Sequence, residues 1–371
     1  MINDFILDDE NRIKEIDKDD MYKFLMNMPD SCAEILTMSK KIQFSHEIKE
    51  FGHILICGMG GSAIGGNLVQ DLLIDKIPIP IIIHRGYKIP AFINKRTLMI
   101  VISYSGNTEE TLSAFAEGIE HKCTIIGLSS NGKLIEYCKK LGIEYIKVPA
   151  EIQPRAAIPY LFIAILIILQ KLKIIQNFTQ DLEESISVLK NLREELAIKS
   201  PNTNNLAKKI AIGIKGAIPM IYATSGYGSL ARRMKCQINE NSKNPAHWDE
   251  FPELNHNEIV GWELKSDITQ KCCVILLRIN EEDEAIKNRI EITKDVVLKD
   301  KFKEIFEIWG HGTSKLAKMF SLLFIGDCIS YYLAILNGVD PTPVKSISEL
   351  KKKLKERLNI LNLIEKKLFS A

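Results

Sequence analysis

The feature that most constrains the fold is a series of short apolar runs separated by helix-length segments. The runs lie at 53–57, 79–83, 98–102, 124–128 and 145–148. Each has the length of a strand without clear polar–apolar alternation, which predicts strands buried on both faces. Because parallel neighbours need a crossover connection that is usually a helix, the pattern predicts a doubly wound parallel α/β sheet flanked by helices.

A second series repeats this plan further along the chain, at 218–222, 273–277 and 305–308. The order strand, glycine-bearing loop, helix at 54–72 recurs at 219–238, and this weak internal similarity suggests two related domains. The predicted organisation is a helical segment over 1–50, a first α/β domain over 51–175, a helical linker over 176–209, a second α/β domain over 210–345 and a lysine-rich, solvated C-terminal helix over 346–371.

Composition excludes several classes of protein. Hydrophobic residues make up 46% of the chain, and 49 basic against 47 acidic side chains give a net charge of +2, so we expect no nucleic-acid partner and no membrane surface. The longest apolar run, 156–169, is too short for a membrane span and predicts a buried helix. The acidic start of the given sequence leads us to expect no secretory signal. Eight cysteines without a C-x-x-C pair predict reduced thiols and a cytoplasmic location.

The glycine-rich loop at 58–66, after the first predicted strand, is a candidate anion site. Glycines let backbone amides approach a ligand, and the free N–H groups at the start of a helix favour an anion. The spacing Gly58-x-Gly60-x-x-Ala63 also fits a dinucleotide fingerprint, with Arg85 suited to a 2′-phosphate. Close packing of the helix on the sheet is the purely structural alternative.

Hydroxyl side chains cluster in the loop after the third predicted strand, where Ser103, Ser105 and Thr108 surround a glycine. A helix N-cap explains only one of these hydroxyls. A phosphate accepts many hydrogen bonds, so the three side chains, together with Gly61 and Ser62 of the first loop, predict a phosphate cradle that needs no lysine.

Gly-Gly-Ser followed by Ser-x-Ser-Gly-x-Thr-x-Glu resembles the sugar isomerase (SIS) domain. Four further segments narrow the resemblance: Pro154-Arg155-Ala156-Ala157, Asn239-Glu240-Asn241-Ser242-Lys243, Pro252-Glu253-Leu254-Asn255-His256-Asn257 and Gly338-Val339-Asp340-Pro341-Thr342-Pro343. Over about residues 50–350, the set resembles the bifunctional phosphoglucose/phosphomannose isomerases, best known from archaea. The resemblance implies two flavodoxin-like SIS domains, a homodimer, and conversion of glucose 6-phosphate or mannose 6-phosphate into fructose 6-phosphate through a cis-enediol(ate), without metal or cofactor.

Three residues match the chemistry that this resemblance implies. Glu240 aligns with the glutamate that serves as the catalytic base in the family. Without the resemblance, its position near a helix end would predict an ordinary solvated glutamate. Arg233 shares its helical face and is expected to help keep the carboxylate ionised. His256, in a polar loop, matches a histidine that assists ring opening and reaches the site from the partner subunit. Arg155, otherwise a helix-flanking charge, matches an arginine near the reacting oxygens that would stabilise the enediolate.

The chain departs from the family pattern at one position. Some relatives carry a substrate-contacting lysine in the last apolar helix, where this chain has Tyr332. Tyr332 and Lys345 are the two candidates for this contact.

Other functions stay open on sequence grounds. A sugar-phosphate sensor needs only the phosphate loops, but no effector segment is evident, and an NADP-dependent oxidoreductase leaves the hydroxyl cluster without a role. A metal-dependent isomerase could use His247, Asp249, Glu250 and His256. However, no H-x-x-x-H or H-E-x-x-H spacing occurs, and zinc-dependent phosphomannose isomerases have an all-β architecture, so we expect no metal.

Overall fold

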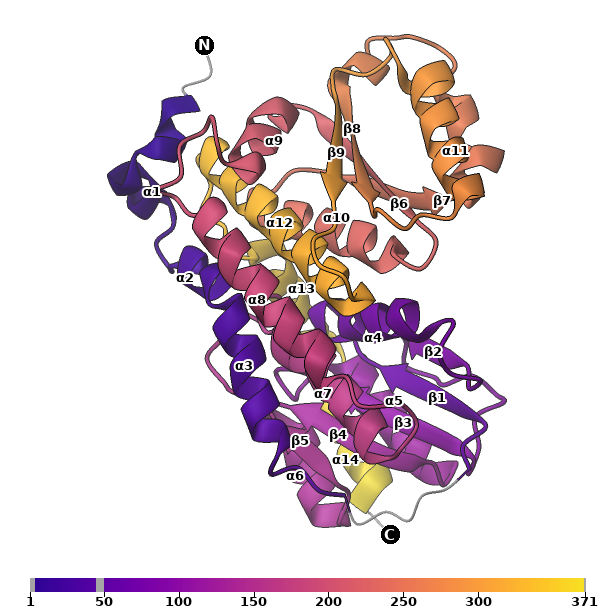
Figure 1. Cartoon of the computed structure of the whole chain (residues 1–371). Coiled ribbons are helices and arrows are strands. Elements are labelled where there is room, and N and C mark those ends of the chain that lie inside the picture. Colours follow the sequence, from indigo (N-terminus) through magenta and orange to yellow (C-terminus); the bar gives the residue numbers. More distant parts are fainter. Residues whose placement is uncertain (1–3, 45–49, 370–371) are drawn as a thin grey trace. The chain divides into compact units, whose positions relative to one another are not determined.

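The computed structural model describes residues 4–44 and 50–369, which form two compact α/β units (Figure 1). The first, called the 31–178 unit, combines Ser31–Phe178 with the tail that begins at Val344. The second, called the 179–343 unit, combines Thr179–Pro343 with the N-terminal segment that ends at Asp30.

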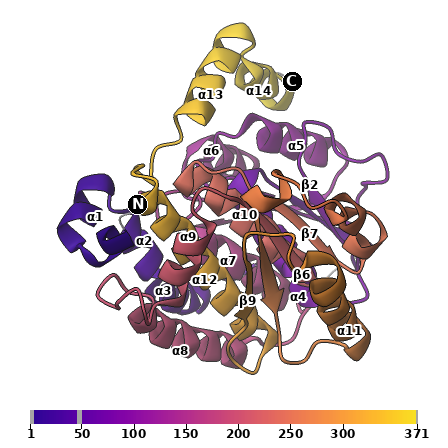
Figure 2. The ribbon, with the colours of Figure 1, turned by 90° about the horizontal axis from the view of Figure 1, so that it is seen from above.

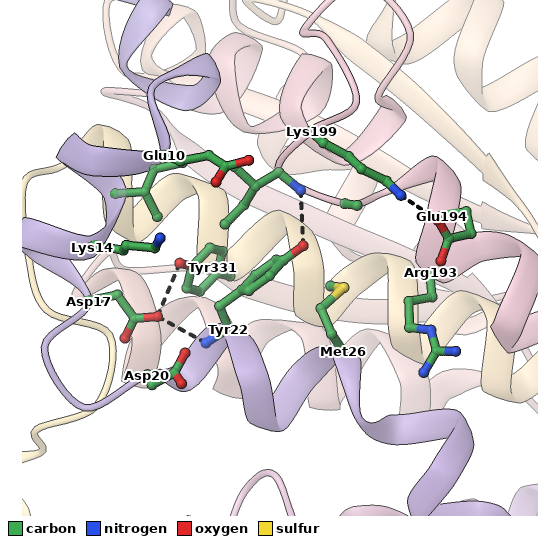
Figure 3. A pocket seen from close by; sticks show the side chains of 13 residues that line it. Glu10, Lys14, Asp17, Asp20, Tyr22, Met26, Arg193, Glu194, Lys199 and Tyr331 are labelled. Atoms are coloured by element: carbon green, nitrogen blue, oxygen red, sulfur yellow. Dashed lines mark hydrogen bonds and ion pairs between the residues drawn. The ribbon is translucent and has the colours of Figure 1, made fainter.

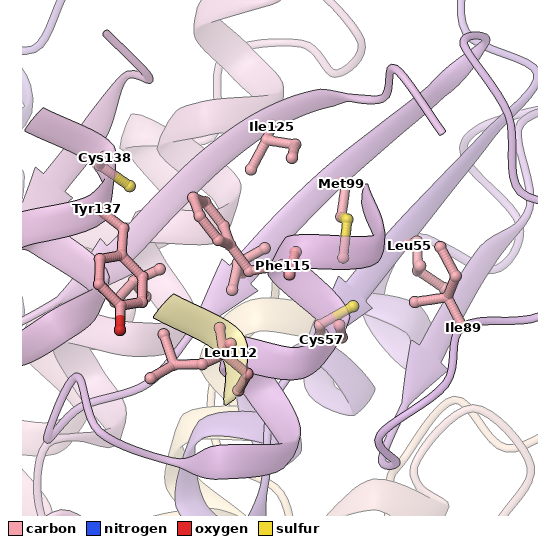
Figure 4. Close-up of a cluster of buried hydrophobic side chains, with 14 of the residues drawn as sticks. Leu55, Cys57, Ile89, Met99, Leu112, Phe115, Ile125, Tyr137 and Cys138 are labelled. Carbon is pink, nitrogen blue, oxygen red and sulfur yellow. The ribbon is translucent and has the colours of Figure 1, made fainter. Parts of the chain in front are cut away.

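A five-stranded parallel sheet organises the 31–178 unit, in the order β2-β1-β3-β4-β5. Its elements are α3 (Met28–Ser39, which crosses the unit boundary), β1 (His53–Cys57), α4 (Gly60–Leu73), β2 (Ile81–His84), β3 (Thr97–Ile102), α5 (Glu109–Glu120), β4 (Thr124–Ser129), α6 (Gly132–Leu141), β5 (Tyr145–Lys147) and α7 (Ile158–Lys171). The strand order is that of flavodoxin-like folds. Helix α4 packs on the face that carries Ile56, whereas α5 and α6 cover the face that carries Leu55 and Val101 (Figure 4).

A four-stranded parallel sheet organises the 179–343 unit, in the order β7-β6-β8-β9. Its longer elements are η1 (Asp4–Asp8), α1 (Glu10–Ile16), α2 (Met21–Met26), α8 (Thr179–Glu195), α9 (Leu206–Ile214), β6 (Ile218–Thr224), α10 (Gly228–Ser242), β7 (His247–Phe251), β8 (Cys272–Arg278), α11 (Glu284–Ile292), β9 (Ile305–Trp309) and α12 (Lys315–Leu336). Short turns are η2 (Glu253–His256), η3 (Glu258–Trp262), η4 (Thr269–Lys271) and the π-helical η5 (Thr293–Leu298). The strand order repeats the first four positions of the other sheet, and α10 and α11 lie on opposite faces (Figure 1).

The predicted fold class is confirmed, with two differences in the strands. Strand β7 is missing from the prediction because its sequence, His-Trp-Asp-Glu-Phe, is an edge strand and not an apolar run. The run predicted at 79–83 forms its strand only from Ile81, after Pro78 and Pro80. Proline has no N–H for the ladder, which delays the start of pairing.

The predicted linker over 176–209 is wrong as a separate segment. Helices α8 and α9 pack against α12 and belong to the 179–343 unit. The predicted N-terminal helical segment is helical over α1 to α3, but the boundary between the units falls inside it, at Asp30. Its part at 45–49 lies outside the described residues. The polar composition of this segment predicted a linker. A narrow apolar stripe that includes Leu182 and Leu189 is nevertheless enough for α8 to pack against the buried helix α12.

Two helices are strongly apolar and buried. The predicted buried helix over 156–169 is confirmed as α7, in which every residue from Ile158 to Leu169 is buried. Helix α12 is long and apolar enough to cross a bilayer by length and composition, but its most apolar window is fully buried inside the structure. Burial of this kind is typical of the core helix of a globular unit.

The tail is two helices, α13 (Lys345–Arg357) and α14 (Ile360–Phe369), and not the single solvated helix that its lysines predicted. Helix α13 has no buried residue, as expected from its charge. Helix α14 lies beside α5 (Figure 2) and buries Ile364 in the cluster that contains Leu112 and Tyr137. The Tyr137 hydroxyl donates a 3.1 Å hydrogen bond to Glu365, so part of the tail completes the core of the 31–178 unit.

Replacing Ile364 by alanine is expected to lower the free energy of unfolding by about 2–3 kcal/mol, because it removes a buried branched side chain from this cluster. Leu363, its neighbour in sequence, is 54% exposed, so Leu363→Ala is the matched control and should change stability by less than about 0.5 kcal/mol. Urea denaturation measures both. Equal effects of the two variants would contradict the docking of α14.

Candidate active site

The first predicted phosphate loop links β1 to α4. Helix α4 starts at Gly60, and its N-cap residue, Met59, makes no side-chain capping bond. Gly60 has φ +50°, a conformation that favours glycine, and a Cβ on Gly61 would lie 3.2 Å from the Pro154 carbonyl oxygen. These glycines therefore bring the backbone of the 154–155 segment against the first turn of α4.

The dinucleotide alternative assigned Arg85 to a 2′-phosphate. In the structure, the Arg85 guanidinium donates a hydrogen bond to the side-chain oxygen of Asn67 on α4. The side chain is thus bound to the unit's own helix and has a structural role beside the loop.

The second predicted loop is joined to the first by a hydrogen bond. The Tyr104 backbone N–H donates to Ser62 Oγ at 3.2 Å. Ser103 Oγ donates to Thr108 Oγ1 at 3.0 Å, and Thr108, at the N-cap position of α5, makes no side-chain capping bond. Ser105 is exposed at the loop surface. The hydroxyls of Ser62, Ser103 and Thr108 thus gather where β1 and β3 end, and simple helix capping does not account for them.

Arg155 is anchored next to these loops. The Tyr104 hydroxyl donates to the Pro149 carbonyl and accepts from the Ile152 N–H, both at 3.0 Å, which fixes the segment leading to Arg155. Arg155 is 4% exposed, and its Cα would lie 3.5 Å from a Cβ on Gly61. Within the 31–178 unit, the structure therefore brings the predicted phosphate residues and Arg155 together.

A third loop, which the sequence reasoning missed, supports the second. It runs from Ser129, the last residue of β4, to Gly132, the first residue of α6. The Leu134 N–H donates to the Gly106 carbonyl at 2.9 Å. A Cβ on Gly106, whose φ is +71°, would lie 1.8 Å from the Asn131 carbonyl oxygen. The signal for this loop was the Ser-Ser-Asn-Gly sequence after the fourth apolar run.

Replacing Gly106 by alanine is expected to raise the KM for a sugar phosphate about tenfold or more, because the Cβ forces the second and third loops apart. This corresponds to the loss of a hydrogen bond to a charged group, about 1.5–3 kcal/mol. Gly142→Ala is the control, since Gly142 also has a positive φ (+65°) but no atom within 4 Å of its Cβ position. Steady-state kinetics and a melting curve for both variants test the role, and an unchanged KM in Gly106→Ala would contradict it.

Glu240 lies in the last turn of α10, in the 179–343 unit, and is partly buried. The helix end is fixed by Lys243, whose Nζ donates to the carbonyl oxygens of Glu240 (2.7 Å), Asp340 (3.0 Å) and Pro341 (3.1 Å). Two segments of the resemblance that lie about a hundred residues apart, at 239–243 and 338–343, therefore meet at this lysine.

Arg233, which was expected to help keep Glu240 ionised, has a buried ion-pair partner on another helix. Arg233 and Asp327 form a 2.6 Å ion pair with side chains 3% and 1% exposed. Helical spacing predicted that Arg233 acts on Glu240 along one helix, whereas in the structure its guanidinium forms an ion pair with an aspartate on the neighbouring helix α12.

His256 ends the short helix η2 and is exposed. Its neighbours Phe251 and Leu254 are buried in the core beneath, and Asn255 donates to Thr293 Oγ1 at 2.8 Å. The turn is thus anchored while the imidazole faces outward, and no hydrogen bond to the His256 ring occurs among residues 4–44 and 50–369.

The two candidates for an additional substrate contact occupy different environments. Tyr332 is fully buried, its hydroxyl donates to the Leu196 carbonyl at 2.5 Å, and burial raises the pKa of the phenol. This placement makes Tyr332 a core residue and argues against a substrate contact. Lys345 is exposed at the start of α13, in the 31–178 unit.

The residues considered for a metal are only partly brought together. His247 and Asp249 lie near Glu258, with one ligand atom of each within 4.8 Å of the others. Glu250 and His256 are not part of this group, and Glu258 was not among the residues considered from the sequence.

A cavity of about 360 Å³ lies among α1, α2 and the 193–199 segment of the 179–343 unit (Figure 3). Tyr22 and Tyr331 line it, and Tyr331 donates to Asp17 at 3.1 Å. Burial raises the pKa of the Asp17 carboxyl. None of the sequence-predicted site residues lines this cavity.

Comparison with known proteins first defines the class. A family model described as the bacterial phospho-glucose isomerase C-terminal SIS domain matches residues 203–354. The crystal structure of tagatose-6-phosphate ketose/aldose isomerase from Escherichia coli superposes with a TM-score of 0.65 at 14% identity, over 87% of this chain and 96% of that chain. The protein therefore has the SIS fold.

Relatives then define the family. A bifunctional phosphoglucose/phosphomannose isomerase from Caldicellulosiruptor bescii is 41% identical over 337 residues, covering 91% of this chain and 99% of the relative. One from Aquifex aeolicus is 36% identical over 311 residues, covering 84% and 92%. The chain belongs to the family of bifunctional phosphoglucose/phosphomannose isomerases. The resemblance carried by the six motifs is confirmed, and with it the enzyme class, a sugar-phosphate isomerase rather than an oxidoreductase.

Proposed function

We propose that this chain interconverts glucose 6-phosphate and mannose 6-phosphate with fructose 6-phosphate, using neither a metal ion nor a cofactor. The observation that carries the proposal is the pair of joined loops in which Ser62, Ser103 and Thr108 gather hydroxyls beside the uncapped start of α4. Relatives whose names state both isomerase activities support it.

The loops would hold the phosphate group. Backbone amides at Gly61 and the hydroxyls of Ser62, Ser103, Ser105 and Thr108 are neutral donors, and the positive end of the helix dipole adds to them. Anchoring a phosphate far from the reacting carbons lets remote binding energy orient C1 and C2 for proton transfer.

Glu240 would act as the base. In the open-chain aldose, its carboxylate removes the proton from C2, the electrons of the C–H bond form the C1–C2 double bond, and the carbonyl oxygen becomes the enediolate oxygen. Return of the proton to C1, with transfer of a proton between the two oxygens, gives the ketose. Because C2 is planar in this intermediate, glucose and mannose phosphates share it, which accounts for both substrates.

His256 and Arg155 would serve the steps around proton transfer. An imidazole has an ordinary pKa near neutrality, which suits proton exchange with the ring oxygen during ring opening. The outward position of His256 supports a homodimer in which His256 of the partner subunit serves this site. Arg155, held beside the phosphate loops, would stabilise the negative charge of the enediolate.

We also infer a cytoplasmic location. The eight cysteines are free thiols, and most of them are buried, as suits a reducing compartment.

The test is incubation of the purified protein with fructose 6-phosphate, with and without EDTA, followed by NMR of the products. Glucose 6-phosphate and mannose 6-phosphate in both samples are expected. A single aldose would reduce the proposal to one activity, binding without turnover would favour a sensor, and loss of turnover in EDTA would contradict metal independence.

A further inference from the structure

Three side chains with metal-ligand atoms converge at the edge of the sheet in the 179–343 unit. They are His247 and Asp249 of β7 and Glu258 at the start of η3, with ligand atoms all within 4.8 Å of one another. His247 and Asp249 are two residues apart on a strand, so they project from the same face. The proposed isomerase chemistry uses none of the three.

The cluster is held by hydrogen-bonded neighbours. Glu258 Oε1 accepts a 2.8 Å hydrogen bond from the Tyr222 hydroxyl, which itself accepts from Trp262 Nε1 at 3.0 Å. Tyr222 is the register partner of Asp249 on the adjacent strand. Outer partners of this kind orient the ligands of metal sites.

The charges of the cluster are unbalanced. His247 Nε2 lies 3.3 Å from Glu258 Oε1. In the described part of the chain, this is the only ion pair that Glu258 forms, and Asp249 forms none. Two carboxylates therefore share this edge, and no lysine or arginine of the described residues forms an ion pair with either of them. The Glu258 side chain is 18% exposed and that of His247 47% exposed, so an ion from solvent can reach them.

We propose that His247, Asp249 and Glu258 bind a divalent transition-metal ion of the zinc class. Imidazole nitrogen with two carboxylate oxygens is a donor set typical of such ions, whereas calcium and magnesium prefer oxygen alone. Bonds of about 2.1 Å in a tetrahedral site place ligand atoms roughly 3.4 Å apart. His247 Nε2 and Glu258 Oε1 already lie at 3.3 Å, and atoms up to 4.8 Å apart need to move closer by at most about 1.4 Å. The bound ion would tie edge strand β7 to the segment that follows His256, outside the reaction itself.

Metal binding is measured directly, on the full-length protein stripped of metal and kept reduced. Isothermal titration with Zn²⁺ is expected to show one saturable site, and Zn²⁺ is expected to raise the melting temperature. His247→Ala and Asp249→Asn should each weaken binding about 100-fold or more and abolish the thermal shift, since even outer-partner changes cost 10–100-fold. His121→Ala, which removes an exposed histidine in the other unit, is the control and should bind as the unmodified protein does.

Cobalt(II) distinguishes this site from the cysteines. The expected spectrum lacks the intense near-ultraviolet charge-transfer band that thiolate ligands give. Absence of saturable binding, equal binding by His247→Ala and Asp249→Asn, or a thiolate band would each overturn the proposal. The titrations contain no sugar phosphate, so their outcome is independent of whether the isomerase proposal holds.

Discussion

Replacing Glu240 by glutamine is expected to lower kcat for isomerisation by about 10²–10⁴-fold, the usual contribution of a positioned base. The amide has nearly the shape of the carboxylate but cannot accept the proton from C2. Lys243 holds the end of α10 through backbone carbonyls, including that of Glu240, and the substitution leaves these bonds in place. The KM should change little, because the phosphate ligands proposed above are other residues.

The control for this variant is Glu284→Gln, an exposed glutamate at the start of α11 in the same unit, which should retain full activity. Stopped assays in both directions measure kcat, and exchange of the C2 proton with solvent deuterium reports proton abstraction separately. A Glu240→Gln protein with full kcat and full exchange would contradict the assigned base.

Replacing Asp327 by alanine is expected to lower the free energy of unfolding of the 179–343 unit by about 3–5 kcal/mol. The substitution leaves the Arg233 guanidinium, 3% exposed, without the carboxylate that lies 2.6 Å from it. A buried charge that loses its partner retains its desolvation penalty without the compensating attraction. Urea denaturation followed by circular dichroism measures the loss.

Two further variants separate the charge effect from simple loss of packing. The double variant Arg233→Met, Asp327→Leu should recover most of the stability, because apolar residues of similar size often replace a buried pair at little cost. Glu349→Ala breaks an exposed pair with Lys353, whose side chains are 66% and 67% exposed, and should cost less than about 1 kcal/mol. If Asp327→Ala is no more destabilising than Glu349→Ala, the pair is not a stabilising feature of the helix packing.

Much of the proposed phosphate site follows from local sequence. The loops around Ser62 and Ser103 follow buried parallel strands, and the carboxyl ends of such strands meet at one edge of the sheet. The loop after one strand therefore lies near the loop after its neighbour, as the hydrogen bond from the Tyr104 N–H to Ser62 Oγ shows. The third loop at 129–132 follows the same rule, but its role depends on a backbone contact with Gly106 that sequence spacing does not express.

Residues that act through distant partners were harder to predict. Arg233 was expected to support Glu240 because both lie on one helical face, yet its charge meets Asp327 on another helix. Tyr332 occupies the position at which some relatives carry a substrate-contacting lysine. In the structure its side chain is fully buried, and its hydroxyl donates a hydrogen bond to the Leu196 carbonyl. Asp327 and Leu196 lie far along the chain from Arg233 and Tyr332, so no local sequence pattern identifies these pairs.

By itself, the sequence determined the α/β class, the repeated strand–loop–helix plan and the family, because buried strands, glycine turns and ordered motifs are local properties of the chain. Only the tertiary structure decided that α8 and α9 are part of a packed unit, that α14 completes the core beside α5, and that His247, Asp249 and Glu258 converge. The packing of α8, α9 and α14 depends on apolar contacts between segments distant in sequence, whereas the three polar side chains converge because the turn after β7 folds back beside that strand.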